Sequence, residues 1–423
     1  MIWPTKKLDS LTKRRRPITY GVVKPGESPS NGVRFVRSGD LVDGKVKVDG
    51  LRTISNDVST QYSRTKLSGG ELLVGLVGNP GEVALVPASL SGGNIARQVA
   101  LVDLDAGVDR RFIYYFFRSS TGRSQLFART LGSVQKVINL RDLKTVDVPL
   151  PPVEIQRQIS RLLGALDDKI ELNRQTARTL EELAQRLFKS WFVDFDPVRA
   201  KMAGRQPAHT PPEIADLFPD RLVDSPLGPI PEGWRCGKLG EIVTLLDSKR
   251  VPLSKKQRAD MPGSYPYYGA ASCMDYVGDY LFDDVLVLMA EDGSVTDGKG
   301  RPTLQYVWGK CWVNNHAHVL KGCDPFSDEM IYLSLADKEI TPFVTGAVQP
   351  KLNQRNLKSI PLVIPSSPIC AKFSEIVNDM FKRIRQLHDE CEVLTELRDR
   401  LLPKLISGEI RVPARTTEME DAL

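Results

Sequence analysis

The 423-residue sequence predicts an α+β chain: two mixed, mostly β domains separated by two long helices that form an antiparallel coiled coil, with an internal pseudo-two-fold repeat. Three observations predict this architecture. A short string occurs twice, a β-rich region precedes each copy, and a long helical pattern follows each copy. A duplicated domain and helix favours a function with two similar halves.

The repeated string fixes the relation between the two halves. Residues 132–144 read GSVQKVINLRDLK and residues 346–358 read GAVQPKLNQRNLK, so Gly, Val, Gln, Asn, Arg, Leu and Lys coincide at a constant offset of 214. The apolar positions of the segments that follow, residues 159–187 and 373–401, keep the same offset. The repeat therefore includes the helices as well as the string.

The region before each string predicts short strands and one short helix. Apolar or alternating runs at residues 71–77, 83–87 and 284–289 are separated by turns rich in Gly, Pro and Asn, a pattern typical of strands. Short helices are expected near residues 112–117 and 329–336, in the same place in each half.

The segment after each string predicts a long amphipathic helix. Its apolar residues recur every three or four positions, and the resulting stripe must be covered. If a two-fold axis relates the halves, the two helices cover each other antiparallel, and each domain packs near the far end of the other domain's helix. Asn173 is expected to be a polar core residue that fixes the register. The alternative is that each helix packs only on its own domain.

These patterns give the following organisation. We expect the β-rich domains at residues 1–150 and 232–365, the long helices at 151–193 and 366–408, a proline-rich linker at 194–231 and a C-terminal tail at 409–423. Proline at the density found in the linker favours an extended connection.

Composition predicts a cytoplasmic protein with no membrane span and no signal peptide. The six cysteines all lie in the second half without a C-x-x-C pair, so neither a disulfide framework nor a zinc site is indicated. Charge is uneven: residues 1–131 hold 20 Lys and Arg against 11 Asp and Glu, whereas residues 232–345 hold 12 against 16. The first domain thus has the charge of a nucleic-acid-binding protein, and the second has only a local basic cluster.

Several longer strings resemble a known family. LPPVEIQRQISRLLGALDDKIELNRQ (150–175), LFKSWFVDFDPVRAKMAGR (187–205), LGPIPEGWRCGKLGEI (227–242) and LRDRLLPKLISGEIRV (397–412) are similar to the specificity subunit of type I restriction-modification enzymes. The resemblance implies two target recognition domains and a chain that is not an enzyme. It also implies binding of double-stranded DNA together with two methyltransferase and two restriction subunits. S-adenosylmethionine, ATP and magnesium are then expected on those partners, and no cofactor in this chain.

Base reading needs amide, Arg and small polar side chains on loops, with Lys and Arg on phosphates. In the first domain the candidates are Lys13, Arg14, Arg15, Arg16, Lys24, Arg34, Arg64, Lys66, Asn94, Arg97, Gln98 and Gln135. In the second they are Lys249, Arg250, Lys255, Lys256, Arg258, Tyr267, Tyr268, Lys299, Arg301, Asn314, Asn315, His316 and Gln349. Gln135 and Gln349 belong to the repeated string, so we interpret them as framework or backbone contacts.

No catalytic or metal site is expected. Residues 293–299 read GSVTDGK, one residue short of a phosphate-binding loop, and Arg301-Pro302 follows where a helix should start. His316 and His318 share a strand face without a third ligand at metal spacing, so core or groove histidines are expected. Two other function classes stay open: a helical scaffold without DNA affinity, suggested by the acidic second domain, and a nucleotide-dependent enzyme that uses residues 293–299.

Overall fold

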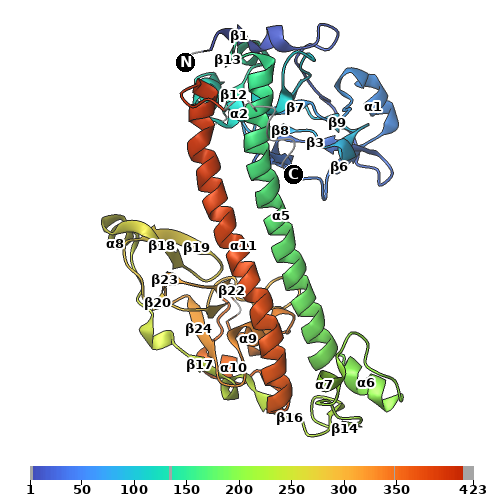
Figure 1. Cartoon of the computed structure of the whole chain (residues 1–423), viewed down its shortest axis with the longest axis vertical. Coiled ribbons are helices and arrows are strands. Elements are labelled where there is room, and N and C mark those ends of the chain that lie inside the picture. Colours follow the sequence, from blue (N-terminus) through green and yellow to red (C-terminus); the bar gives the residue numbers. More distant parts are fainter. Residues whose placement is uncertain (1–2, 133–135, 347, 413–423) are drawn as a thin grey trace, which may run out of the picture. The chain divides into compact units, whose positions relative to one another are not determined.

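The computed structural model describes residues 3–132, 136–346 and 348–412, and the chain divides into two compact units (Figure 1). Unit 1 contains residues 1–172 and 390–423, and unit 2 contains residues 173–389. Each unit therefore combines one β-rich domain with part of each long helix. The two helical segments of a unit belong to its folded core.

The long helices are α5 (Val153–Phe192) and α11 (Ser367–Ser407), of 40 and 41 residues. At 1.5 Å per residue each is about 60 Å long. In unit 1 the first turns of α5 share a core with the last turns of α11, through Ile159, Leu163, Leu402 and Leu405. Within unit 2 the second half of α5 shares a core with the first half of α11. The helices are therefore antiparallel, as predicted, and each domain packs against the C-terminal end of the other domain's helix.

Unit 1 is built on a four-stranded sheet of order β2-β10-β7-β8. Its strands are Thr19–Tyr20, Val99–Val102, Leu72–Gly75 and Val83–Leu85. A three-stranded sheet contains β6 (Arg52–Ile54), β3 (Val33–Val36) and β9 (Asn94–Ile95). Three smaller sheets have two strands each. They pair β1 (Thr5–Lys7) with β13 (Asp147–Pro149), β4 (Leu41–Val42) with β5 (Lys45–Val46), and β11 (Thr130–Leu131) with β12 (Val137–Ile138). The short helices are α1 (Asn56–Gln61), α2 (Arg110–Arg118), α3 (Ser120–Phe127) and α4 (Leu140–Lys144).

Unit 2 repeats this plan with a four-stranded sheet of order β17-β24-β21-β22. Its strands are Val243–Leu245, Ala317–Gly322, Leu286–Ala290 and Leu304–Val307. A second sheet contains β19 (Cys273–Val277), β18 (Pro262–Tyr268), β23 (Lys310–Val313) and β20 (Phe282–Asp283), and β16 (Arg235–Lys238) pairs with β25 (Pro361–Ile364). The short helices are α8 (Lys255–Asp260), α9 (Asp328–Ala336) and α10 (Gln354–Lys358).

One short helix in each unit ties the domain to the long helices. In unit 1 the Tyr115 hydroxyl on α2 donates to Asp167 of α5 at 2.7 Å, and Arg398 of α11 binds the same carboxylate at 2.7 Å. In unit 2 the Tyr332 hydroxyl on α9 donates to Glu181 of α5 at 2.9 Å, and Tyr332 packs against Phe381 of α11. The short helix predicted before each repeated string is thus confirmed in both units, and it connects the domain to the long helices.

The proline-rich segment after α5 is folded, which corrects the expectation of an extended connection. It contains α6 (Asp196–Met202), α7 (Pro212–Ala215) and a strand pair, β14 (Leu222–Val223) with β15 (Ile230–Pro231). The segment folds because apolar residues lie between its prolines. Of these, Phe195, Val198 and Phe218 are buried against the end of α5. Trp191 and Phe218, for example, form an edge-on ring pair with centroids 5.1 Å apart.

Two further observations concern the whole described chain. None of its six cysteines is in a disulfide. Within the described ranges even the two longest helices are too polar to cross a membrane.

Candidate nucleic-acid interface

In both domains the repeated string is held beside the same turn. We call residues 132–138 and 346–352 repeat loops 1 and 2, and residues 96–98 and 314–316 turns 1 and 2. In the first domain the Ile138 N–H donates to Leu76 O at 2.9 Å, and the Leu76 N–H donates to Gln98 O at 2.8 Å. In the second, Leu352 N–H donates to Glu291 O at 2.8 Å and Glu291 N–H donates to His316 O at 2.9 Å. The backbone connections are equivalent.

The side chains on the two turns differ, although their backbone hydrogen bonds are equivalent. Turn 1 exposes Arg97 and half-exposes Gln98, whereas turn 2 exposes Asn315 and His316. His316 Nδ1 lies 2.8 Å from the Asp292 carboxylate, and the ring is 49% exposed. These are donor and acceptor groups of the kind that recognise base edges. Two turns with equivalent backbone hydrogen bonds therefore present different polar side chains.

Repeat loop 2 also reaches the surface. Gln349 is exposed and Val348 is 99% exposed at the tip of repeat loop 2, whose base is held by the Leu352 hydrogen bond. Gln135, the matching residue of repeat loop 1, lies outside the described residues.

Beneath turn 2 lies a charge cluster of Asp247, Arg250, Glu291 and His318. Asp247 accepts hydrogen bonds from His318 Nδ1 at 2.6 Å and from the Val319 N–H at 2.8 Å. His318 is fully buried, and its Nε2 lies 2.7 Å from Leu352 O in repeat loop 2. The two ring nitrogens thus connect the Asp247 carboxylate to the backbone of repeat loop 2. The cluster therefore fixes the base of repeat loop 2.

The electrostatics of the cluster follow from these contacts. Burial by itself would raise the pKa of the Asp247 carboxyl, but the hydrogen bonds from His318 and Val319 and the charge of Arg250 hold that pKa below its usual value. Ligand atoms of Asp247, Glu291 and His318 lie within 4.8 Å of one another, which is close enough to hold a metal ion. However, the Arg250 guanidinium lies 3.4 Å from Asp247 and 2.9 Å from Glu291, and both His318 nitrogens are engaged. These residues form an ion network, not a metal centre.

The predicted basic residues of the first domain come together in part. Lys13, Arg15, Arg16, Arg64 and Lys66 line one open hollow of about 580 Å³, which we call the basic hollow. Arg14, Lys24 and Arg34 are exposed elsewhere on the same domain. Clustered Lys and Arg side chains on an open surface suit the phosphate backbone of a nucleic acid.

Two of these cations pair with buried carboxylates. The Arg16 guanidinium pairs with Glu71 at 2.8 Å and Asp103 at 3.1 Å and also binds the Lys66 carbonyl. Lys13 pairs with Asp103 at 2.9 Å. Arg16 is therefore a structural residue at the base of the hollow, because buried carboxylates neutralise it. Arg14 and Arg15 have no carboxylate partner among the described residues.

In the second domain the basic cluster also divides. Lys249, Lys255 and Lys256 are exposed, but Arg250 belongs to the buried charge cluster. Arg258 pairs with Asp275 at 2.8 Å and stacks over the Tyr267 ring. The exposed residues remain candidates, whereas the two arginines are engaged within the domain.

Three of the residues predicted to contact DNA have buried side chains, which corrects that prediction. Asn94 is fully buried and bonds to Ser59 at 2.6 Å, Tyr267 is 1% exposed and accepts from the Leu253 N–H, and Asn314 is 3% exposed. Each lies on a strand or turn whose neighbours face the core, so its polar group supports the fold. Tyr268 is half-buried and Lys299 is exposed.

The glycine-rich residues 293–299 do not form a phosphate-binding loop. Asp297 accepts hydrogen bonds from the N–H groups of Lys299 and Arg301, and Arg301 also pairs with Asp337 at 3.0 Å. The next element is strand β22, so no helix N-terminus faces the loop. The segment is a capped turn.

The partnership of Asp247, Glu291 and His318 could not be predicted from the sequence. His316 and His318, which share a predicted strand face, differ in environment: His316 is exposed in turn 2 and His318 is buried in β24. Asp247 and Glu291 are far from His318 in the sequence, so no local pattern indicates that these side chains meet. Only the pairing of β17 and β21 with β24 brings these groups together.

Comparisons with known proteins agree with this arrangement. A family model described as the type I restriction modification DNA specificity domain matches residues 6–182 and 231–394. The chain is 26% identical to the type I restriction enzyme MjaIX specificity subunit of Methanocaldococcus jannaschii, over 97% of this chain and 94% of that protein. It is 24% identical to the type I restriction enzyme HindI specificity subunit of Haemophilus influenzae, over 89% of this chain and 94% of that protein.

A solved structure shares the fold. The crystal structure of the type I restriction-modification system S subunit from M. genitalium matches with a TM-score of 0.58 at 16% identity, over 98% of this chain and 97% of that one. The family match includes both domains and most of both long helices. The chain therefore belongs to the family of type I restriction-modification DNA specificity proteins.

Proposed function

We propose that this chain is the non-catalytic subunit that reads a bipartite DNA target, one half-site per domain, and that it acts in the cytoplasm. It recruits two methyltransferase subunits and two restriction subunits. S-adenosylmethionine, ATP and magnesium belong to those partners, and this chain contributes recognition and assembly.

One observation carries the proposal. Turns 1 and 2 have the same backbone connections to their repeat loops, but they expose Arg97 and Gln98 in one domain and Asn315 and His316 in the other. A reader of two unrelated half-sites needs this combination of a constant frame and variable polar side chains. The exposed cations of both domains supply phosphate contacts that fix the protein on the duplex.

Methylome sequencing of a host that expresses the assembled complex tests the proposal. Replacing Asn315 and His316 by Ala should relax recognition in one half of the methylated motif. The matched variant Arg97→Ala should relax the other half. If either change altered both halves, or if exchange of residues 232–365 for those of a relative altered neither, independent reading by two domains would be wrong.

The rival functions are tested on the same material. A helical scaffold predicts that the assembled complex binds DNA without the steep salt dependence of phosphate contacts. A nucleotide-dependent enzyme predicts ATP binding by this chain alone, although residues 293–299 form a capped turn. We expect salt-dependent DNA binding, no ATP binding, and neither methylation nor cleavage by the purified chain.

A further inference from the structure

The tip of repeat loop 2 exposes an apolar side chain. Val348 is 99% exposed, whereas the next most exposed large apolar side chain of the described residues, Phe127, is 69% exposed. Gln349 beside it is exposed as well. Single exposed apolar residues are ordinary on a protein surface, so the exposure by itself assigns no role to Val348.

The same residue types recur at the matching place of the other half. GSVQ at residues 132–135 and GAVQ at residues 346–349 share glycine, valine and glutamine, although Val134 and Gln135 lie outside the described residues. Turns 1 and 2, in contrast, carry different side chains in the two halves. A valine and a glutamine that are present in both halves suit a feature that two different half-sites have in common.

The backbone of repeat loop 2 is a narrow hairpin. Thr345 and Lys351 exchange both backbone hydrogen bonds, at 2.8 and 2.7 Å. Gly346 begins the turn at φ 90°, and a Cβ on it would lie 2.3 Å from the Gln349 carbonyl oxygen, so a larger residue would clash with the backbone. Gly132 begins repeat loop 1 at φ 91°. The hairpin is therefore closed just below its tip.

The hairpin adjoins turn 2 and is long enough to reach a base stack. Asp292 joins the two, because its backbone bridges to Lys351 and its carboxylate pairs with His316 at 2.8 Å. Val348 is three positions from the Thr345–Lys351 pair, so it extends up to about 10 Å beyond that pair. The grooves of B-DNA are about 7.5 and 8.5 Å deep. When turn 2 lies against base edges, the tip therefore reaches the neighbouring base pairs.

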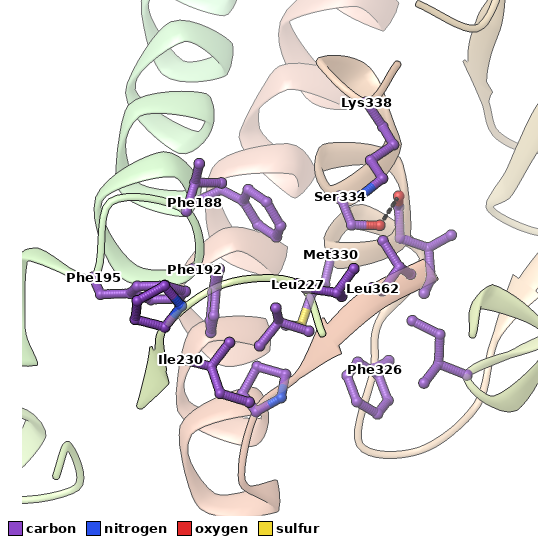
Figure 2. A pocket seen from close by; sticks show the side chains of 16 residues that line it. Phe188, Phe192, Phe195, Leu227, Ile230, Phe326, Met330, Ser334, Lys338 and Leu362 are labelled. Atoms are coloured by element: carbon purple, nitrogen blue, oxygen red, sulfur yellow. Dashed lines mark hydrogen bonds between the residues drawn. The ribbon is translucent and has the colours of Figure 1, made fainter. Parts of the chain in front are cut away.

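Unit 2 exposes apolar groups at a second place, but with the opposite shape. Phe188, Phe192 and Leu227 line an open cavity of about 300 Å³ near the end of α5 (Figure 2). A cavity receives a group from its ligand, whereas a protruding tip enters the ligand. Of the two features, the tip is the one that is connected to turn 2. The tip is therefore the apolar group that suits insertion into DNA.

Insertion of this kind meets a requirement of methyl transfer. An enzyme that modifies a base takes it out of the stack, which costs unstacking and unpairing energy and leaves a gap in the duplex. An apolar side chain that enters the stack offsets part of that cost, as it does in proteins that insert apolar wedges between base steps. The base left behind has unpaired donors and acceptors. A glutamine amide both donates and accepts, so it can bond to any of the four bases.

We propose that repeat loop 2 enters the duplex when the methyltransferase subunit extrudes its target base. Val348 enters the gap, and Gln349 hydrogen-bonds to the base that is left without a partner. Neither side chain selects the sequence, which agrees with the presence of the same two residue types in both halves. The proposal rests on the proposed function, which supplies a methyltransferase subunit for each half-site, and adds how this chain helps to open the target pair.

Single-turnover methylation by the assembled complex tests this role. Two duplexes carry the methylated motif: one is fully paired, and the other has an abasic site opposite the target base of the half-site read by residues 232–365. Val348→Ala and Gln349→Ala should each slow methyl transfer to that half-site about tenfold or more on the paired duplex, because less of the unpairing cost is offset. On the abasic duplex no pair has to be broken, so both rates should return to within about twofold of the wild type.

Matched controls separate insertion from other effects. Val348→Leu keeps an apolar tip and should methylate both duplexes like the wild type. So should Val223→Ala, which shortens an exposed valine on β14 outside repeat loop 2. The half-site read by residues 1–150 is an internal control, because its domain is unchanged. Since Val348 and Gln349 are exposed, unfolding midpoints should match that of the wild type.

Three results would overturn the proposal. The first is methylation of the paired duplex by Val348→Ala at the wild-type rate. The second is an equal loss of rate on the two duplexes, which would assign the tip to a step other than base extrusion. The third is a loss of methyltransferase subunits from the variant complex, measured by native mass spectrometry, which would make the tip a protein contact.

The proposed function fails in a different way. If the wild-type complex shows no sequence-dependent methylation of either duplex, DNA reading is wrong. If the wild type methylates its motif and the repeat-loop variants do so at the same rate, reading stands and only the insertion is wrong.

Discussion

Replacing Asp247 by Asn should strongly destabilise the second domain. The Asp247 side chain is 4% exposed and accepts hydrogen bonds from His318, the Val319 N–H and Gln354 at 2.6, 2.8 and 2.7 Å. Asparagine can keep the bond from Val319, but its NH₂ group then faces the donors of His318 and Gln354. It also removes one of the two carboxylates that neutralise Arg250, whose side chain is only 11% exposed.

The size of the effect follows from this loss. Removing one partner of a buried ion pair costs about 3–5 kcal/mol, because the remaining charge is left uncompensated. A domain is stable by only about 5–15 kcal/mol, so we expect a large fall in the unfolding midpoint of unit 2. The matched control Asp292→Asn breaks only the exposed pair with His316 and should cost less than about 1 kcal/mol.

Denaturant unfolding monitored by tryptophan fluorescence measures this change. Four of the five tryptophans, Trp191, Trp234, Trp308 and Trp312, lie in unit 2, so the signal reports mainly that unit. A free energy of unfolding that falls by less than about 1 kcal/mol in Asp247→Asn would refute the argument that the cluster holds buried charges.

Acid provides an independent check of the same carboxylate. Because the folded-state pKa of Asp247 is lowered, its contribution to stability is fully present above the unfolded value of about 3.9 and is lost as pH falls through the lower folded value. The wild type should therefore lose stability below about pH 4 more steeply than Asp247→Asn. Equal acid dependence of the two proteins would contradict the lowered pKa.

Three further predictions concern other parts of the chain. Arg14→Ala should weaken DNA binding to every sequence and reduce the salt slope by about 0.9, whereas Arg16→Ala should mainly lower stability, as salt titrations and unfolding curves will show. Asn173→Leu should raise the free energy of unfolding by about 1–3 kcal/mol, because the buried side-chain amide nitrogen of Asn173 has no partner among the described residues; an unchanged midpoint would argue against that cost. Four helix-forming residues inserted after Leu172 and after Asp389 should lengthen each long helix by about 6 Å and increase the unread spacer by about one or two base pairs, which methylome sequencing measures; an active complex with its old spacer would show that the helices do not set the distance.

The repeated architecture could be predicted from the sequence because each of its signals depends on residues that are close in the sequence. A constant offset of 214 and the three-to-four spacing of apolar residues predict the two long helices and their antiparallel pairing, since an apolar stripe must be covered. The strand runs at residues 71–77 and 284–289 and the short helices before each string were predicted for the same reason. Each depends on residues a few positions apart.

The proline-rich segment shows where local reasoning fails. Its prolines suggested an extended chain, but Phe195 and Phe218 are buried in the core at the end of α5, and the chain folds around them. Burial of aromatic side chains outweighs the intrinsic preference of the backbone, and that burial depends on a helix that ends earlier in the sequence.

The sequence by itself determined that the chain has two similar halves, that each half is a β-rich domain with a long helix, and that basic residues are concentrated in the first. Only the tertiary structure decided which of those basic residues are exposed and free of a carboxylate partner, and can therefore contact a ligand. Arg14 and Arg16 are two positions apart, yet one is exposed and the other is neutralised by Glu71 and Asp103, which are 55 and 87 positions away. His316 and His318 differ in the same way, through Asp247, which lies just after β17. Whether a charged side chain can meet a ligand depends on its solvation and on partners that the fold brings from distant positions, and neither is encoded in the residues beside it.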